Sequence, residues 1–313
     1  MSFGNDSRVL PSKRISTPTF IFTDPGIDDA LALAIAAVSP NLQVIGACGV
    51  DGNVPSRSAT RNLQSLLQLF GMRNVPVFQS AVDDPVHDYP THVHGKNGLG
   101  DVRIKLSKKY KEKDLGDYLK NFQGKFQILS LGPLTAVADL FAKTPEIVDQ
   151  VSRCVIMGGG IAGGNVTPYA EFNIYSNPEA ADWIFRSNVQ KILLPLDVTE
   201  KVRLHQEDLE TLQMKRGQKA RALSGMLQFY FNFQKGSNGI YGGFMHDPTA
   251  VLAITNPELF HFRRARVRVD VNGETRGRTV AIYARDGSTQ IATKVDEDAA
   301  RSEIMAKLLQ ISS

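Results

Sequence analysis

The sequence predicts an α/β fold with a mostly parallel central sheet that is flanked by helices. Short runs of apolar and β-branched residues alternate with longer amphipathic runs over the first half of the chain, as in βαβ units. The chain has 313 residues, 42% of them hydrophobic and 22% charged, so it can bury a full core. No linker or shift of composition divides it. We therefore expect a single domain over residues 19–313, after a disordered polar tail over residues 1–18.

The expected strands of the first half share apolar, β-branched or aromatic side chains and end in turn residues. They cover residues 20–22, 42–50, 75–78, 126–131 and 155–157. The helices expected between them have apolar side chains three or four positions apart. They cover residues 30–37 and 56–70, and a further helix is opened by Gly132-Pro133. Residues 79–102 are typical of a loop, and a loop of this length in a compact domain is usually functional or disordered.

The second half departs from strict alternation. A helix is expected near Pro178, a strand over 189–196 and two helical segments over 206–234. Asp247 before Pro248 is typical of a helix start, with Asp247 as the cap. Residues 263–295 have the pattern of antiparallel strands, and a final helix is expected over 297–309. We therefore expect a small antiparallel region near the C-terminus.

Charge and cysteine usage exclude several classes of protein. The formal charge of +4 comes from 36 basic and 32 acidic residues spread along the chain, so we expect no nucleic acid partner. Cys48 and Cys154 both lie in apolar, strand-like runs and are expected to be buried thiols, not a disulfide. The polar N-terminal segment lacks an apolar signal region, and no later apolar run is long enough to span a membrane. These features predict a cytoplasmic protein with no membrane partner.

The most distinctive stretch contains three aspartates, Asp24, Asp28 and Asp29, directly after the first expected strand. Ligands of open α/β sheets bind at the carboxyl ends of the strands, so these carboxylates could hold a hard cation there. Alternatively, Asp28 and Asp29 could simply complement the dipole of the following helix, at about 0.3–1 kcal/mol each. The three aspartates alone do not decide between the two interpretations.

A glycine cluster at 158–160, continued by Gly163 and Gly164, invites comparison with a dinucleotide-binding loop. That fingerprint requires a helix immediately after the glycines. Here Asn165-Val166-Thr167-Pro168 prolongs the loop, so the signal is weak.

Four blocks of sequence each lie at an expected strand end or loop. They are Asp24-Pro25-Gly26-Ile27-Asp28-Asp29, His94-Gly95-Lys96-Asn97-Gly98, Asn165 to Asn173 (NVTPYAEFN) and His246-Asp247-Pro248. Together, in this order, they resemble the inosine-uridine-preferring nucleoside hydrolases. The resemblance runs from about residue 20 to the C-terminal hairpins. It implies a Rossmann-type core and Ca²⁺-dependent hydrolysis of the N-glycosidic bond of ribonucleosides, giving ribose and a free base.

The resemblance also implies roles for individual residues. Asp24, Asp29, Asp247 and the carbonyl oxygen of Leu131 would bind Ca²⁺, an ion that prefers oxygen ligands. Asp24 would also be the general base toward a water held on the ion, which attacks the anomeric carbon through an oxocarbenium-like transition state. His246 would donate a proton or hydrogen bond to the departing base. The remaining substrate contacts would come from Asp28, Asn165, Glu171 and Asn173 at the ribose hydroxyls, His94 at the base, and Asn53, Phe172, Gln234, Asn238 and Tyr241 around them.

Several points stay open at this stage. Asp247 alone could be a helix cap, Asn165 and Asn173 could be turn residues, and Phe172 could belong to the core. Phe22 stands where the family usually has the first Asp of D-x-D-P-G, so a carboxylate behind the metal site is missing. Base preference is not determined, and family members imply a homodimer or homotetramer only by analogy.

Two rival functions remain. The aspartate cluster could serve a Mg²⁺ phosphohydrolase, although no Lys or Arg adjoins the carboxylates to clamp a phosphate. The chain could also be a non-catalytic nucleoside-binding protein with the same fold.

Overall fold

The computed structural model describes residues 16–85, 89–106, 114–239 and 241–313. Most of the expected tail therefore lies outside the described residues. Its last two residues, Thr17 and Pro18, already belong to strand β1 (Thr17–Thr23), so the folded domain begins slightly earlier than predicted.

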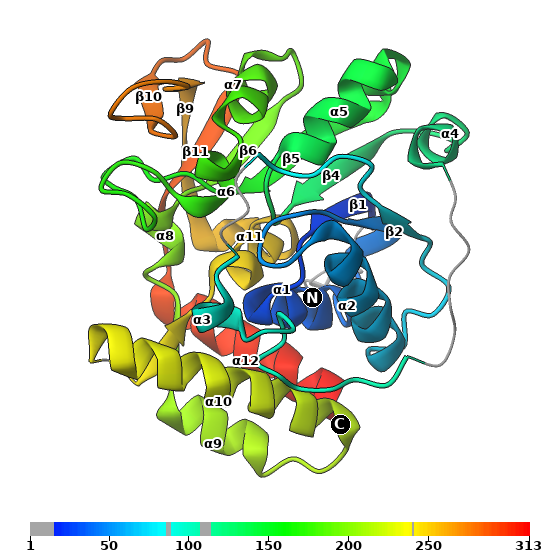
Figure 1. The fold of residues 1–313 in the computed structure, drawn as a ribbon, viewed down its shortest axis with the longest axis vertical. Helices are drawn as coiled ribbons and strands as arrows, with labels where there is room; N and C mark the ends of the chain where they lie inside the picture. Colours follow the sequence, from blue (N-terminus) through cyan, green and yellow to red (C-terminus); the bar gives the residue numbers. More distant parts are fainter. Residues whose placement is uncertain (1–15, 86–88, 107–113, 240) are drawn as a thin grey trace, which may run out of the picture.

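A nine-stranded sheet forms the centre of the molecule, with the strand order β10-β9-β11-β6-β5-β4-β1-β2-β3 (Figure 1). The strands from β3 to β6 are parallel, and β11 pairs parallel with β6 but antiparallel with β9. The predicted parallel sheet is confirmed, and its antiparallel region is one edge of the same sheet. The other strands are β2 (Leu42–Gly49), β3 (Val77–Gln79), β4 (Phe126–Ser130), β5 (Val151–Met157), β6 (Lys191–Leu194), β9 (Phe260–Val269), β10 (Thr279–Tyr283) and β11 (Thr289–Val295).

Helices cover both faces of this sheet (Figure 1). Side chains alternate along the buried strands, so Ile21 packs on one apolar cluster while Phe20 and Phe22 pack on the other. The first cluster contains α1 (Ile27–Ala37), α2 (Ser56–Leu69), α10 (Gln218–Asn238), α11 (His246–Thr255) and α12 (Glu297–Ser312). The second contains α5 (Thr135–Lys143) and α7 (Pro178–Arg186). The remaining helices are α3 (Thr91–His94), α4 (Leu115–Lys120), α6 (Phe172–Ser176), α8 (Leu196–Thr199) and α9 (Gln206–Gln213), and a small second sheet pairs β7 (Arg203–His205) with β8 (Gly242–Phe244).

Two local predictions are wrong. The strand expected over 189–196 ends at Leu194, because Pro195 has no N–H for the ladder and the next residues form α8. Asp247 is not the cap of its helix, since α11 begins one residue earlier and Met245 occupies the cap position. Asp247 therefore lies within the first helical turn, where its side chain is available for other contacts.

Three single-residue expectations concern the core. Cys48 and Cys154 are buried free thiols, as predicted. Phe22 is fully buried, and its ring centroid lies 5.2 Å from that of Phe20. An apolar contact thus occupies the position at which the resembled family usually carries an aspartate.

Among the described residues, no helix is both long and apolar enough to cross a membrane.

Candidate active site

The turn between β1 and α1 holds Asp29 in a fixed position. Gly26 N–H donates to Asp29 Oδ2 over 2.8 Å, and the Thr23 hydroxyl donates to the other carboxylate oxygen. A Cβ on Gly26 would lie only 2.7 Å from the Asn53 and His94 side chains, so this turn requires glycine. The aspartates predicted from sequence therefore lie on a tightly packed strand-to-helix turn.

Asp24 is buried in the same turn, and one of its carboxylate oxygens has no hydrogen-bond partner. Its Oδ2 accepts the backbone N–H of Asn53 over 2.7 Å, whereas Oδ1 is buried with no hydrogen-bond partner. A Cβ on Gly132 would lie 2.4 Å from Oδ1, and one on Gly52 would lie 2.1 Å from Oδ2. Two glycines thus make room for this carboxylate.

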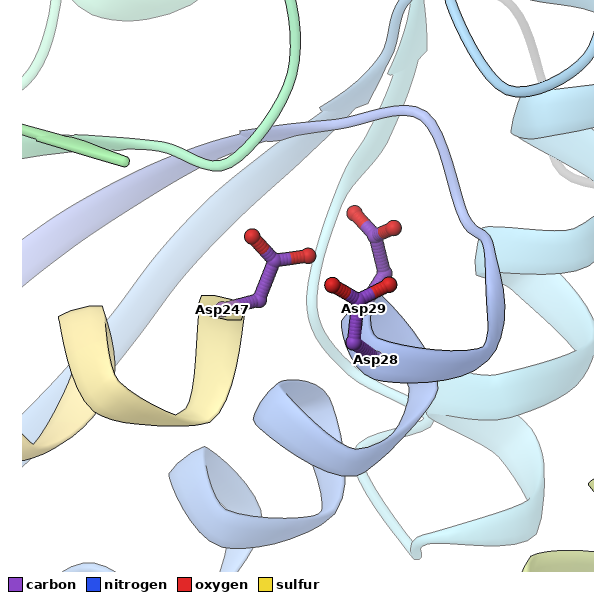
Figure 2. Close-up of side chains that lie close together, drawn as sticks. All are labelled: Asp28, Asp29 and Asp247. Carbon is purple, nitrogen blue, oxygen red and sulfur yellow. The ribbon is translucent and has the colours of Figure 1, made fainter. Parts of the chain in front are cut away.

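Asp247 completes an acidic cluster from the far end of the chain. One carboxylate oxygen each of Asp28, Asp29 and Asp247 lie within 4.8 Å of one another, and all three residues are buried. Figure 2 shows Asp247 reaching across from α11 toward the two aspartates at the start of α1. This trio includes Asp28, which the sequence resemblance assigned to the ribose, and it does not include Asp24.

Burial shifts the acidity of these groups. It raises the pKa of Asp28 and of Asp29 from 3.8 to about 6, with the charge of Asp28 a further cause for Asp29. The pKa values of Asp24 and Asp247 are also raised, first by burial and then by the neighbouring carboxylates. Within the described part of the chain, no Lys or Arg forms an ion pair with any of the four.

These observations fit a hard divalent cation. The clustered donors are carboxylate oxygens, the unpartnered Asp24 Oδ1 is a free ligand atom, and four buried carboxylates need positive charge to remain ionised together. Sulfur ligands are absent from the described cluster, which disfavours zinc.

Metal-free protein should lose stability as the pH rises through this site's titration. Because the pKa of Asp28 and of Asp29 is raised to about 6, the folded state binds more protons than the unfolded chain between 3.8 and that value. Their stabilising contribution is fully present below pH 3.8, falls as the pH rises from that value, and is lost once the pH passes about 6. Melting temperatures of dialysed protein across this range should fall less steeply for Asp28→Asn than for the wild type. Equal dependence of melting temperature on pH in the two proteins would contradict the raised pKa of Asp28.

Asp28 and Asp247 of this cluster line a cavity of about 760 Å³. Eleven residues predicted from sequence line it, and they come from both halves of the chain. They are Asp28, Asn53, His94, Leu131, Asn165, Glu171, Phe172, Asn173, Gln234, His246 and Asp247. Asp24 and Asp29 are buried in the adjoining turn and are not part of the lining.

One predicted substrate contact, Tyr241, is not among the described lining residues. Its ring centroid lies 5.7 Å from that of Phe231, and its hydroxyl contacts Gln228. The side chain of Asn238 lies outside the described residues.

Sequence reasoning missed the aromatic part of the cavity wall. Tyr230, Phe233 and Ser237 were missed; with the predicted Gln234 they line the cavity from one face of α10, at the i, i+3, i+4 and i+7 spacing that marks a helix face. This spacing could have revealed the face, but it could not show that the face borders a cavity. The other lining residues that were missed include His92, Tyr175, Glu200 and Phe244.

The predicted ribose contacts are held by the backbone around them. The Glu171 carboxylate caps α6 and accepts N–H groups from Asn173, Ile174 and Gly159 at 2.9, 3.2 and 2.8 Å. Asn173 Nδ2 donates to the carbonyl oxygens of Leu131 and Met157, over 2.9 and 3.2 Å. The resemblance assigns the Leu131 carbonyl oxygen to the metal. The side chain of Asn173, a predicted ribose contact, thus holds this carbonyl in place.

Both predicted histidines face the cavity as neutral rings. His94 Nδ1 accepts the N–H of Ile27 over 3.1 Å, which leaves Nε2 as the protonated nitrogen. His246 Nδ1 lies 2.8 Å from the Thr199 hydroxyl. Burial lowers the pKa of each histidine to about 4, so at neutral pH each can donate a hydrogen bond without carrying charge.

Comparison with solved structures defines the class of protein. A plant nucleoside hydrolase, PpNRh1, superposes with a TM-score of 0.85 at 30% identity, covering 93% of this chain and 98% of the other. A purine-preferring ribonucleoside hydrolase from Gardnerella vaginalis gives a TM-score of 0.88 at 30% identity, covering 94% and 99%. The fold is that of the nucleoside hydrolases.

Sequence comparison identifies the family. The model of the inosine-uridine preferring nucleoside hydrolases matches residues 19–302. Uridine nucleosidase 1 from Arabidopsis thaliana is 34% identical over 310 residues, which is 93% of this chain and 92% of that protein. The chain therefore belongs to the inosine-uridine preferring nucleoside hydrolase family and is a nucleoside N-glycosyl hydrolase, as the four sequence blocks predicted.

Proposed function

We propose that this protein hydrolyses the N-glycosidic bond of ribonucleosides with the help of Ca²⁺, giving ribose and free purine or pyrimidine base. The observation that carries the proposal is the cavity itself. Its floor contains the buried carboxylates Asp28 and Asp247, and one wall contains the amides and carboxylate of Asn165, Glu171 and Asn173. Sugar hydroxyls fit such a wall, and the developing oxocarbenium ion fits a carboxylate floor.

The cation would be held by Asp24, Asp29, Asp247 and the carbonyl of Leu131, with Asp28 close enough to share that role. When bound, it would supply the positive charge that keeps the carboxylates ionised and would increase the acidity of water. An all-oxygen set of this size suits Ca²⁺, which accepts roughly six to eight oxygen ligands in flexible geometry.

Asp24 is the proposed general base. Its Oδ2 is occupied by Asn53 N–H, so Oδ1 is the oxygen left to accept a proton from the attacking water. Without the cation, burial and the neighbouring carboxylates raise the pKa of Asp24.

The leaving base would depart toward the histidine side of the cavity. His246 is oriented by Thr199, and His94 is oriented by the first N–H of α1, so each presents its other nitrogen to the substrate. Hydrogen bonds from these rings would stabilise negative charge on the departing base. Asn53, Phe172 and Gln234 would complete the substrate contacts, and Asn238 and Tyr241 stay predictions from the resemblance.

A reducing-sugar assay with inosine, uridine, adenosine and cytidine tests the function and ranks the bases. We expect ribose release with at least one of them in the presence of Ca²⁺. Phosphate released from a phosphorylated substrate would instead support the Mg²⁺ phosphohydrolase, and binding without product would support a non-catalytic nucleoside-binding protein. No Lys or Arg is among the described residues that line the cavity, which disfavours a phosphate substrate.

The assembly and location of the protein are also proposals. The resemblance implies a homodimer or homotetramer. Charge distribution and the lack of long apolar runs predict a cytoplasmic protein without a nucleic acid or membrane partner. Size-exclusion chromatography with light scattering would measure the assembly.

A further inference from the structure

The part of the cavity wall that would hold the ribose contains few buried apolar side chains. We call residues 164–175, which carry Asn165, Glu171 and Asn173, the sugar segment. Val166 and Tyr169 in it are 45% and 36% exposed, and Ala170 and Ile174 are its fully buried apolar side chains. A segment with so few apolar contacts needs other support to hold its polar groups in place.

Besides the hydrogen bonds to Gly159, Leu131 and Met157 described above, support comes from a turn that lies about 100 residues further along the chain. We call residues 270–278, which connect β9 with β10, the clasp turn. Arg278 forms an isolated antiparallel bridge with Ala170, and its guanidinium lies 6.0 Å from the ring centroid of Tyr169. In Figure 1 this connection lies at the same edge of the molecule as α6 and the loop before it.

Gly277 shows how closely the two segments approach each other. Its φ of +85° lies in the left-handed region, and a Cβ there would lie 2.9 Å from Ala170 Cβ and 3.1 Å from Tyr175 Cα. Glycine is therefore required both by the backbone conformation and by the contact.

Arg276 makes a side-chain hydrogen bond between the two segments. Its Nη1 donates to the Tyr175 carbonyl oxygen over 2.9 Å, and its guanidinium lies 5.1 Å above the Tyr175 ring. This carbonyl belongs to the last turn of α6, where helical carbonyls lack partners within the helix. Tyr175 also lines the cavity, so Arg276 connects the clasp turn to the cavity wall.

The clasp turn is itself rigid enough to act as a support. Gly277 N–H donates to the Asp270 carbonyl over 2.7 Å, and the Thr275 hydroxyl donates to the Asp270 carboxylate over 2.9 Å. Asp270 N–H in turn donates to the Arg278 carbonyl over 3.0 Å. These bonds fix both ends of the turn.

The contact between the clasp turn and Ala170 also affects the position of Asn165, which is predicted to contact the ribose. The Ala170 carbonyl accepts the N–H groups of Asn165, Val166 and Thr167, at 3.2, 3.1 and 3.4 Å. Asn165 Oδ1 accepts the N–H of Phe172 over 3.0 Å. Fixing Ala170 therefore fixes the loop that presents Asn165.

From these contacts we infer that the clasp turn positions the sugar segment for nucleoside binding, with Arg276 as a positioning residue. This inference rests on the proposed function for its consequence in catalysis, but the positioning itself is a property of the fold. Without the clasp turn, Asn165 and Asn173 would sample more conformations, and nucleoside would bind more weakly.

Arg276→Met tests this inference, because methionine retains much of the arginine stem but cannot donate the hydrogen bond. We expect amide hydrogen exchange over 164–175 to accelerate about tenfold and KM for the nucleoside to rise about tenfold with a smaller change in kcat, as for loss of one charge-assisted hydrogen bond. Arg276→Lys can still donate to the Tyr175 carbonyl and should restore part of both effects.

Arg266→Met is the matched control. Arg266 lies on the same hairpin and pairs with Asp286, but both side chains are about two-thirds exposed and neither contacts the sugar segment. Arg266→Met should show the wild-type rates of amide hydrogen exchange over 164–175 and the wild-type KM. Equal behaviour of Arg276→Met and Arg266→Met would overturn the inference. If the wild type releases no ribose, the proposed function fails, whereas the exchange rates still decide whether the clasp turn positions the segment.

Discussion

Asp24→Asn is expected to reduce kcat/KM for ribose release by at least about a thousandfold, because it removes the proposed base and a cation ligand together. The asparagine side chain can still accept the Asn53 N–H through its amide oxygen, so the local fold should survive. Steady-state kinetics on a nucleoside that the wild type hydrolyses would measure the loss.

The melting temperature distinguishes lost chemistry from lost folding. In metal-free protein, Asp24→Asn removes a buried carboxyl that lies near the like charges of Asp29 and Asp28, so its melting temperature should equal or exceed that of the wild type. Asp286→Asn, at an exposed position, is the control for a neutralised aspartate. Turnover by Asp24→Asn within about tenfold of the wild type would rule out Asp24 as the base.

Removal and return of calcium should have the second large effect. Dialysis against a chelator should abolish ribose release, and Ca²⁺ should restore it. A cation that binds only the folded state at a hundred times its Kd adds about 2.7 kcal/mol, which for a chain of this length corresponds to a rise of roughly 4 °C in melting temperature. Calorimetry with and without Ca²⁺ would measure this rise.

Asp247→Asn is the matched variant for the calcium experiment. Asp247 comes from α11, whereas Asp28 and Asp29 come from α1, so its carboxylate closes the cluster from the other side (Figure 2). The variant should lose most of the calcium response in both activity and melting temperature. A full response in this variant would contradict the assignment of the cation to this cluster.

The sequence predicted the parts of the site that lie at strand ends. Asp24, Asp28 and Asp29 stood out because charged residues directly after a buried strand are exposed to ligand at the sheet edge. The βαβ alternation fixed the parallel sheet, since each crossover brings the next carboxyl end to the same edge. His94 and Asp247 were identified through the family resemblance, and both line the cavity.

The remaining features depend on contacts between distant segments. Tyr230 and Phe233 follow ordinary helical spacing, which does not distinguish a face on a cavity from a face on the core. The clasp turn was predicted only as a hairpin turn, because its contact with Tyr175 spans 101 residues of sequence. Asp28 joins Asp29 and Asp247 because α1 and α11 pack together, a fact that local sequence does not contain.

Hydrolysis in ¹⁸O-labelled water tests the central claim most directly. In phosphate-free buffer with Ca²⁺, we predict free base and ribose in equal amounts, with one ¹⁸O on the anomeric carbon of the ribose at the moment of release. Mass spectrometry of ribose trapped by immediate reduction would detect the label before exchange with solvent. Absence of both products, or base release that requires added phosphate, would contradict the account.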